Sequence, residues 1–257
     1  MLFTPLEQFQ IISIFPIKFF CLDFSLTNLV LINVIVLFLM GFVIRFISSG
    51  PGFGNRGSFF IVPGVWQTFF EMVYETVGQL VYDNLNSDGE KYLPYISTLF
   101  VFILFNNLIG LIPYSFTVTS HLIVTFTLSL SIFIGVIIIG CQRHKVQMLS
   151  VFLPANTSFF LALLLVPIEL ISYIFKPISL GVRLFANLMA GHTLLKVIVG
   201  FSWSLLMLED LLALAHIIPL LILVMLMGLE LGVAIIQAYV FTVLTCIYLN
   251  DSINLSH

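Results

Sequence analysis

The sequence predicts an all-α integral membrane protein. Of its 257 residues, 60% are apolar and only 8% are charged, whereas a soluble globular domain is about one quarter charged. Several apolar runs are also long enough to cross a hydrocarbon core of roughly 30 Å, which takes about 20 helical residues. We expect one membrane domain over residues 1–257, with transmembrane helices, an amphipathic surface helix and two long, strongly tilted C-terminal helices.

The first transmembrane helix is predicted over 25–47, after an N-terminal segment of residues 1–24. The opening residues do not resemble a targeting peptide, because Glu7 precedes Lys18, the first basic residue. We therefore expect the chain to enter its membrane without a cleaved leader. Residues 48–56 are rich in Gly, Ser and Pro and are predicted to form a loop.

The amphipathic helix is predicted over 63–85. Its apolar residues recur at helical spacing, and its polar residues follow at steps of four on the opposite face: Gln67, Glu71, Glu75, Gln79 and Asp83. Such a pattern is typical of a helix that lies on a membrane surface or against other helices.

A helical hairpin is predicted over 94–140. Two apolar spans, Pro94–Ile112 and Thr119–Gly140, are joined there by Pro113–Ser115. A joint this short predicts two antiparallel helices.

The long helix pair is predicted over 155–250, from two apolar stretches, Ser158–Gly200 and Ser204–Leu249. As a single helix, each stretch would be about 65 Å long, roughly twice the membrane thickness. Each could instead fold back as two spans. Pro167, Pro177 and Pro219 have no polar or Gly-rich neighbours, so we favour long, tilted or bent helices.

The orientation follows from the basic residues. Five of them fall on one side of the predicted topology: Arg45, Arg56, Lys91, Arg143 and Lys145. The other side has Lys18 and the acidic pair Glu209 and Asp210. Short loops rich in Lys and Arg stay on the cytoplasmic or matrix side, so the N-terminus is predicted outside and the C-terminus inside.

Charged residues within the apolar spans are candidates for function, because each costs several kcal/mol in a membrane. Glu169, Lys176 and Arg183 follow one another at steps of seven, which places them on about the same helix face, and Asn187 extends this face. These residues could be structural ion pairs. The spans offer few acids to neutralise both cations, however, and an arginine stays protonated, so we expect a counter-charge for Arg183 from another protein.

His192 and Glu230 form a second candidate pair, suited to a proton relay between adjacent helices. Each also has a simpler interpretation. A membrane histidine is often only hydrogen-bonded, and Glu230 lies within Gly228-x-x-x-Gly232, a close-packing motif. Gln237 repeats the step of seven after Glu230 and could be the hydrogen-bond partner of its carboxylate.

Other classes of protein fit the sequence less well. The net charge of −3 without a basic tract disfavours a nucleic-acid partner, and the absence of a G-x-x-x-x-G-K-[ST] loop disfavours nucleotide binding. Cys21, Cys141 and Cys246 lack metal-site spacing, and we expect no cofactor. A secondary transporter remains the main alternative, although no inverted repeat is evident. A haem or quinone subunit is a second alternative, but haem ligation would need paired histidines on facing helices.

Two segments carry a resemblance to a known family. KPISLGVRLFAN over Lys176–Asn187, followed by Ala190-Gly191-His192, and GLELGVAIIQAYVF over Gly228–Phe241 resemble the signature of ATP synthase subunit a, the proton-channel subunit of the Fo sector. The similarity covers roughly residues 25 to 250. It implies a stator subunit without catalytic activity of its own, which couples proton flow to rotation and ATP synthesis.

The resemblance also implies roles for particular residues. Arg183 matches the essential arginine that faces the carboxylates of the rotating c-ring. Polar groups at or near the half-channel on the proton-rich side are matched by Glu230, His192, Asn187 and Gln237, and an acid of the opposite half-channel by Glu169. Many bacterial members have an acid at position 192 and a histidine at position 230, so the exchanged arrangement here resembles mitochondrial forms of plants and protists.

The partners and location implied by the resemblance are the c-ring, the peripheral stalk and other Fo subunits, with protons as the transported ion and membrane lipids around the chain. The expected location is the mitochondrial inner membrane, with the N-terminus toward the intermembrane space and the C-terminus toward the matrix.

Overall fold

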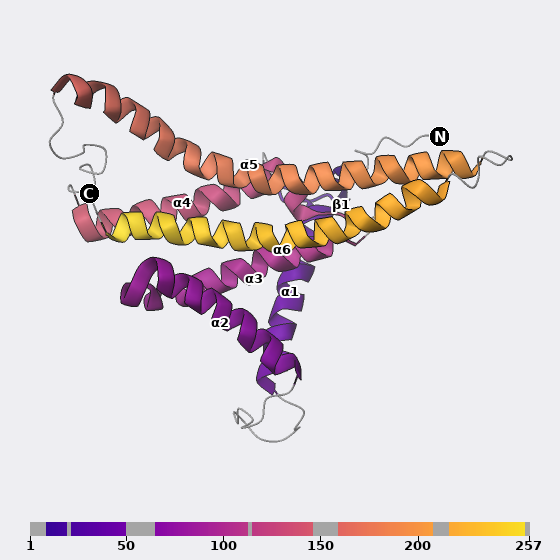
Figure 1. The fold of residues 1–257 in the computed structure, drawn as a ribbon, viewed down its shortest axis with the longest axis horizontal. Coiled ribbons are helices and arrows are strands. Elements are labelled where there is room, and N and C mark those ends of the chain that lie inside the picture. The colour runs from indigo at the N-terminus through magenta and orange to yellow at the C-terminus, as the bar shows by residue number, and fades with distance from the viewer. Residues whose placement is uncertain are drawn as a thin grey trace. The chain divides into compact units, whose positions relative to one another are not determined.

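The computed structural model describes residues 9–19, 22–49, 65–112, 115–145, 159–207 and 216–254. Helices make up most of these segments (Figure 1). In chain order the α-helices are α1 (Asn28–Ser49), α2 (Val65–Leu85), α3 (Leu93–Gly110), α4 (Leu122–His144), α5 (Phe159–Leu206) and α6 (Ile217–Ile253). Two 3₁₀ helices, η2 (Asn86–Lys91) and η3 (Val118–Ser120), precede α3 and α4.

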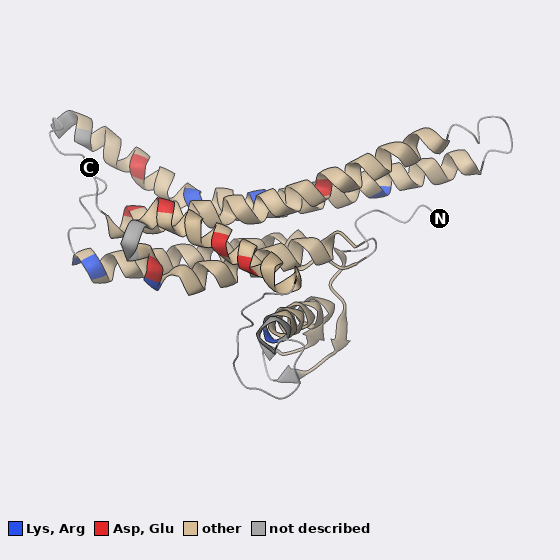
Figure 2. Ribbon diagram, turned by 60° about the horizontal axis from the view of Figure 1, so that its bottom comes forward, with Lys and Arg blue, Asp and Glu red and all other residues tan. Residues whose placement is uncertain are grey.

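The predicted helical membrane fold is confirmed. Four helical segments are long and apolar enough to cross a bilayer: Gly89–Gly110, Leu122–His144, Leu163–Leu206 and Ile217–Ile253. A shorter apolar stretch, Asn28–Val43, lies in α1. Acidic and basic residues are sparse along the helices (Figure 2), as a lipid-facing surface requires.

The two long C-terminal helices are confirmed as continuous elements. α5 has 48 residues and runs through both Pro167 and Pro177, and α6 has 37 residues. These lengths correspond to about 72 Å and about 55 Å. Because both exceed a hydrocarbon core of about 30 Å, each helix has to tilt, bend or extend beyond it. α5 continues to Leu206, past the break expected near residues 201–203, and the acidic pair at 209–210 lies outside the described residues.

The N-terminal segment contains strands that the sequence analysis did not predict. β1 (Ser13–Phe15) pairs antiparallel with β4 (Leu26–Thr27), and β2 (Lys18–Phe19) pairs with β3 (Leu22–Asp23). This stretch is rich in Ile and Phe, and β-branched and aromatic residues favour extended backbone. The result is a short β-hairpin directly before α1.

The connection between α3 and α4 is longer than expected. The second span was predicted to begin at Thr119, but Thr119 lies in η3 and α4 begins at Leu122. The Ser120 hydroxyl donates a hydrogen bond to the Thr117 carbonyl over 2.6 Å, and such local bonds compete with helix formation. Residues 113–114, part of the predicted joint, lie outside the described residues.

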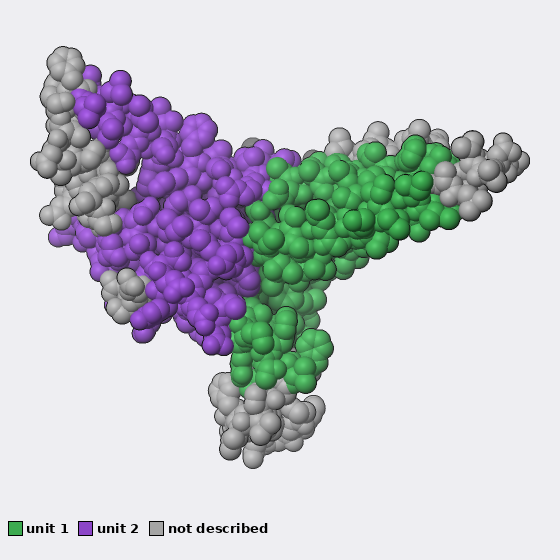
Figure 3. All heavy atoms as spheres, in the orientation of Figure 1, with its two compact units in different colours: residues 1–73, 101–121, 186–238 green, residues 74–100, 122–185, 239–257 purple. Residues whose placement is uncertain are grey.

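The chain divides into two compact units (Figure 3). Unit 1 comprises residues 1–73, 101–121 and 186–238, and unit 2 comprises residues 74–100, 122–185 and 239–257. Each unit has its own buried apolar residues. In unit 1 they include Val36, Ile103, Leu188 and Ala234, and in unit 2 they include Leu85, Ile96, Leu184 and Phe241.

Close helix packing in unit 2 depends on Gly181 of α5. A Cβ atom at this position would lie 2.7 Å from the Ser129 hydroxyl oxygen and 3.0 Å from the Thr125 carbonyl oxygen of α4. A larger residue would therefore push the two backbones apart, as expected where small residues line a membrane helix interface. The end of α4 is also tied to α6, since His144 Nε2 lies 2.7 Å from the Ile253 carbonyl oxygen.

Candidate functional site

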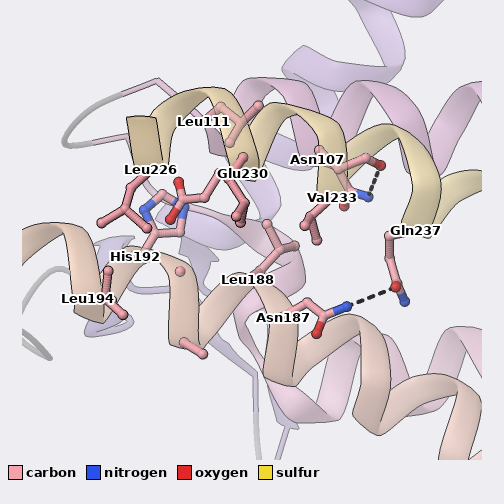
Figure 4. A pocket seen from close by; sticks show the side chains of 14 residues that line it. Asn107, Leu111, Asn187, Leu188, His192, Leu194, Leu226, Glu230, Val233 and Gln237 are labelled. Carbon is pink, nitrogen blue, oxygen red and sulfur yellow. Dashed lines mark hydrogen bonds between the residues drawn. The ribbon is translucent and has the colours of Figure 1, made fainter. Parts of the chain in front are cut away.

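Unit 1 contains a cavity of about 250 Å³ between α3, α5 and α6. Its walls are mostly Leu, Val, Ala and Gly residues. Five polar side chains interrupt this apolar lining (Figure 4): Asn107 from α3, Asn187 and His192 from α5, and Glu230 and Gln237 from α6. Four of the six site residues that the sequence predicted therefore lie around one cavity, although they come from two helices.

Asn187 and Gln237 are in direct contact. The Asn187 Nδ2 group donates a hydrogen bond to Oε1 of Gln237 over 2.9 Å (Figure 4). The Nε2 atom of Gln237 is buried and has no partner among the residues that the structure describes. A buried polar atom without a partner is rare in proteins and indicates a bound water where the site is polar and roomy enough.

His192 and Glu230 lie side by side toward the other part of the cavity (Figure 4). His192 is buried, with 7% of its surface exposed, and Glu230 is half-buried. The carboxylate of Glu230 lies so close to Gly191 that a Cβ atom there would be 2.5 Å from Oε1. Within the described residues, no hydrogen bond joins the imidazole to the carboxylate, and the Nε2 atom of His192 has no partner.

Substituting Gly191 by alanine is expected to move the Glu230 carboxylate without preventing assembly, because the end of a flexible side chain can shift to accommodate the new methyl group. A displacement of about 1 Å in a reacting group can lower a rate by about 100-fold, so we expect passive proton flow through Fo to fall by at least about tenfold. The measurement is acid-quenched dye fluorescence in vesicles.

Gly228→Ala is the matched control, since a Cβ atom at Gly228 has no neighbour within 4 Å. It should conduct as the wild type does. Equal proton flow in Gly191→Ala and Gly228→Ala would contradict the importance of the carboxylate position.

Asn107 is a site residue that the sequence analysis missed. It is fully buried, and its Nδ2 group donates a hydrogen bond to the Ala234 carbonyl over 3.2 Å. Its Oδ1 atom has no partner among the described residues. The available signal was the pair Asn106-Asn107, two adjacent amides near the end of an apolar span. Polar residues at such depth are costly, so they are candidates for function in the same way as charged residues.

Lys176 has a counter-charge within the chain, a partner that the sequence analysis did not identify. Its Nζ atom lies 3.5 Å from Oδ2 of Asp251 near the end of α6. It also lies 5.4 Å and 5.1 Å from the ring centroids of Tyr173 and Tyr248, within the range of cation–π attraction. Asp251 follows the last apolar residues, so it was not among the acids within the apolar spans that were considered as partners.

Arg183 and Glu169 lie in unit 2 and do not line the cavity. The Arg183 side chain is exposed, whereas Leu180 and Leu184 beside it are buried. Arg183 has no hydrogen bond or ion pair with any residue that the structure describes. Glu169 is half-buried. The guanidinium group thus lies on an exposed face of α5.

Comparison with known proteins identifies the family of the chain. The ATP synthase A chain family matches residues 26–250. The chain belongs to the ATP synthase subunit a family. It is 49% identical to ATP synthase subunit a of Chondrus crispus over 98% of this chain and 96% of that protein. The corresponding protein of Marchantia polymorpha is 48% identical, over 98% of both chains. That of Pylaiella littoralis is 50% identical, over 97% of this chain and 98% of that protein.

Family membership settles the broad function. Members are the proton-channel subunit of the Fo sector of ATP synthase and are not catalytic by themselves. The secondary transporter that the sequence left open is therefore set aside.

Proposed function

We propose that this chain provides two aqueous half-channels to a rotating c-ring and that Arg183 separates them. The observation that carries the proposal is that four polar side chains meet around one cavity within apolar helices: Asn187, His192, Glu230 and Gln237. In addition, Arg183 is exposed and has no ion pair among the described residues. Polar groups that converge at membrane depth are typical of ion pathways.

The proposed mechanism follows from the cost of charge in lipid. A c-ring carboxylate crosses the lipid in its neutral form and is ionised only opposite Arg183, where the opposite charge stabilises it. An arginine suits this role because it stays protonated at all relevant pH values. Each proton that crosses the membrane supplies about 2.3 kcal/mol per 100 mV, and this energy drives rotation.

The cavity of unit 1 is proposed as the inner part of the half-channel on the proton-rich side. His192 and Glu230 relay protons through it, and the hydrogen-bonded Asn187 and Gln237 extend its polar lining. Glu169 serves the half-channel on the opposite side. The buried, unpartnered atoms of His192 and Gln237 support this proposal, because they are places for the water that a proton path requires.

The proposed location is the mitochondrial inner membrane, with the N-terminus toward the intermembrane space and the C-terminus toward the matrix. The basic residues of the loops support this orientation, and the pairing of His192 with Glu230 supports a mitochondrial type. The proposed partners are the c-ring, the peripheral stalk and the other Fo subunits.

Glu230→Gln tests the function directly. The substitution keeps the shape of the side chain and removes its proton exchange, so passive proton flow through Fo is expected to fall by at least about 100-fold, the usual contribution of one positioned proton carrier. Glu75→Gln is the control, because Glu75 is exposed on α2 and does not line the cavity. Both complexes should retain the c-ring on purification. Normal proton flow in Glu230→Gln would overturn the proposed channel.

A further inference from the structure

The N-terminal arm, defined here as residues 9–27, has one residue that differs from its neighbours. Phe9 is buried, with 7% of its surface exposed. The apolar residues at positions 11–17 are exposed, including Ile12 at 60% and Phe15 at 63%. Phe9 is thus the anchor of the arm on the rest of unit 1.

Asn28, at the start of α1, fastens this arm. Its Oδ1 atom accepts a hydrogen bond from the Ile12 amide over 3.2 Å, and its Nδ2 group donates one to the Gln10 carbonyl over 3.1 Å. The backbone N–H of Asn28 also donates a hydrogen bond to the Ile12 carbonyl over 3.2 Å. Three bonds from one residue hold the backbone next to Phe9, and the pairing of β1 with β4 continues this attachment. The position of Phe9 is therefore fixed from the α1 side.

The anchored ring lies against the proposed proton carrier. The ring centroids of Phe9 and His192 are 6.0 Å apart, and the ring planes meet at 72°. This edge-to-face geometry is a favourable arrangement of aromatic rings. On its other sides His192 has Gly110, where a Cβ atom would lie 3.9 Å from Nε2, and the cavity that it shares with Glu230.

We propose that Phe9 is a positioning residue for His192: the N-terminal arm places an aromatic ring edge-on against the imidazole and holds it in the cavity beside Glu230. This inference rests on the proposed role of His192 as a proton carrier. The Gly110 backbone also interacts with the imidazole, but Nε2 has no hydrogen-bond partner among the described residues, so ring packing contributes to the position of the imidazole. With an aliphatic side chain in place of Phe9, the imidazole of His192 would be packed as well but would turn more freely.

The experiment uses the complete synthase with Phe9→Ala, Phe9→Leu and Phe9→Tyr. Passive proton flow is expected to fall about two- to tenfold in Phe9→Ala, the range that the loss of one aromatic pair allows. It should fall less in Phe9→Leu and stay near the wild-type value in Phe9→Tyr. A second readout is independent of proton flow. The rate at which diethyl pyrocarbonate modifies His192, measured by mass spectrometry against His121 in the same sample, should rise in Phe9→Ala only.

The double substitution Phe9→Ala with His192→Gln separates positioning from general packing. If Phe9 acts through His192, removing Phe9 causes no further loss once His192 is replaced. A further loss would overturn the inference, as would wild-type proton flow in Phe9→Leu or unchanged modification of His192 in Phe9→Ala. Should Phe9→Ala fail to assemble, Asn28→Ala releases the arm while keeping the ring, and it should also speed the modification of His192.

Failure of the proposed function has a different signature. In that case His192→Gln alone would conduct protons normally, whatever residue occupies position 9. Failure of this inference alone leaves His192→Gln defective while Phe9→Ala conducts as the wild type does.

Discussion

Replacing Arg183 with alanine is expected to abolish proton-driven ATP synthesis while the complex still assembles. The side chain is exposed on α5 and has no hydrogen bond or ion pair with the described residues, so its removal should change stability by no more than about 0.5 kcal/mol. Its charge, in contrast, has the proposed role of letting a c-ring carboxylate ionise within the membrane. The measurements are ATP synthesis in energised vesicles and retention of the c-ring on purification.

Two further variants sharpen this experiment. Arg183→Lys keeps a positive charge but loses the planar fork and the fixed protonation state of the guanidinium group, so partial activity at most is expected. Lys176→Gln removes a cation one heptad away that is already paired with Asp251. Because such a partly exposed pair contributes only about 0–1 kcal/mol, synthesis should fall by no more than a few-fold. Near-normal synthesis in Arg183→Ala would refute the assignment of Arg183.

Local periodicity was enough to predict the helical membrane fold. The polar residues at steps of four over 63–85 predicted a helix, and α2 spans Val65–Leu85. The isolated prolines Pro167 and Pro177 predicted no turn, and α5 runs through both. These features depend only on neighbours within one element. Motif resemblance then added the family, which the charges alone left open between a channel subunit and a transporter.

Contacts between elements were harder to predict, because they depend on the rotation and shift of one helix against another. One possibility was that Gln237 satisfies Glu230, seven residues earlier, but seven residues rise about 10.5 Å along a helix, too far for a hydrogen bond. Gln237 instead accepts from Asn187 on α5. The placement of Asp251 beside Lys176, and of Phe9 beside His192, likewise depends on three-dimensional arrangement.

The double exchange His192→Glu with Glu230→His is expected to restore part of the proton flow that each single substitution removes. Each single variant leaves two groups of the same kind at the site, either two acids or two histidines. Like groups at close range shift each other's proton affinity apart, so we expect each to conduct at least about tenfold less than the wild type. The exchanged pair again combines one acid with one imidazole.

Recovery requires that the two positions communicate, and the structure supports this because the Glu230 carboxylate lies against Gly191, the neighbour of His192. The side chains face the same cavity without a direct hydrogen bond, so a bridging water is expected between them. Passive proton flow in vesicles, compared across the wild type, both single variants and the exchange, measures the coupling. If the exchange conducts no better than the poorer single variant, Glu230 carries protons without His192, and the relay is wrong.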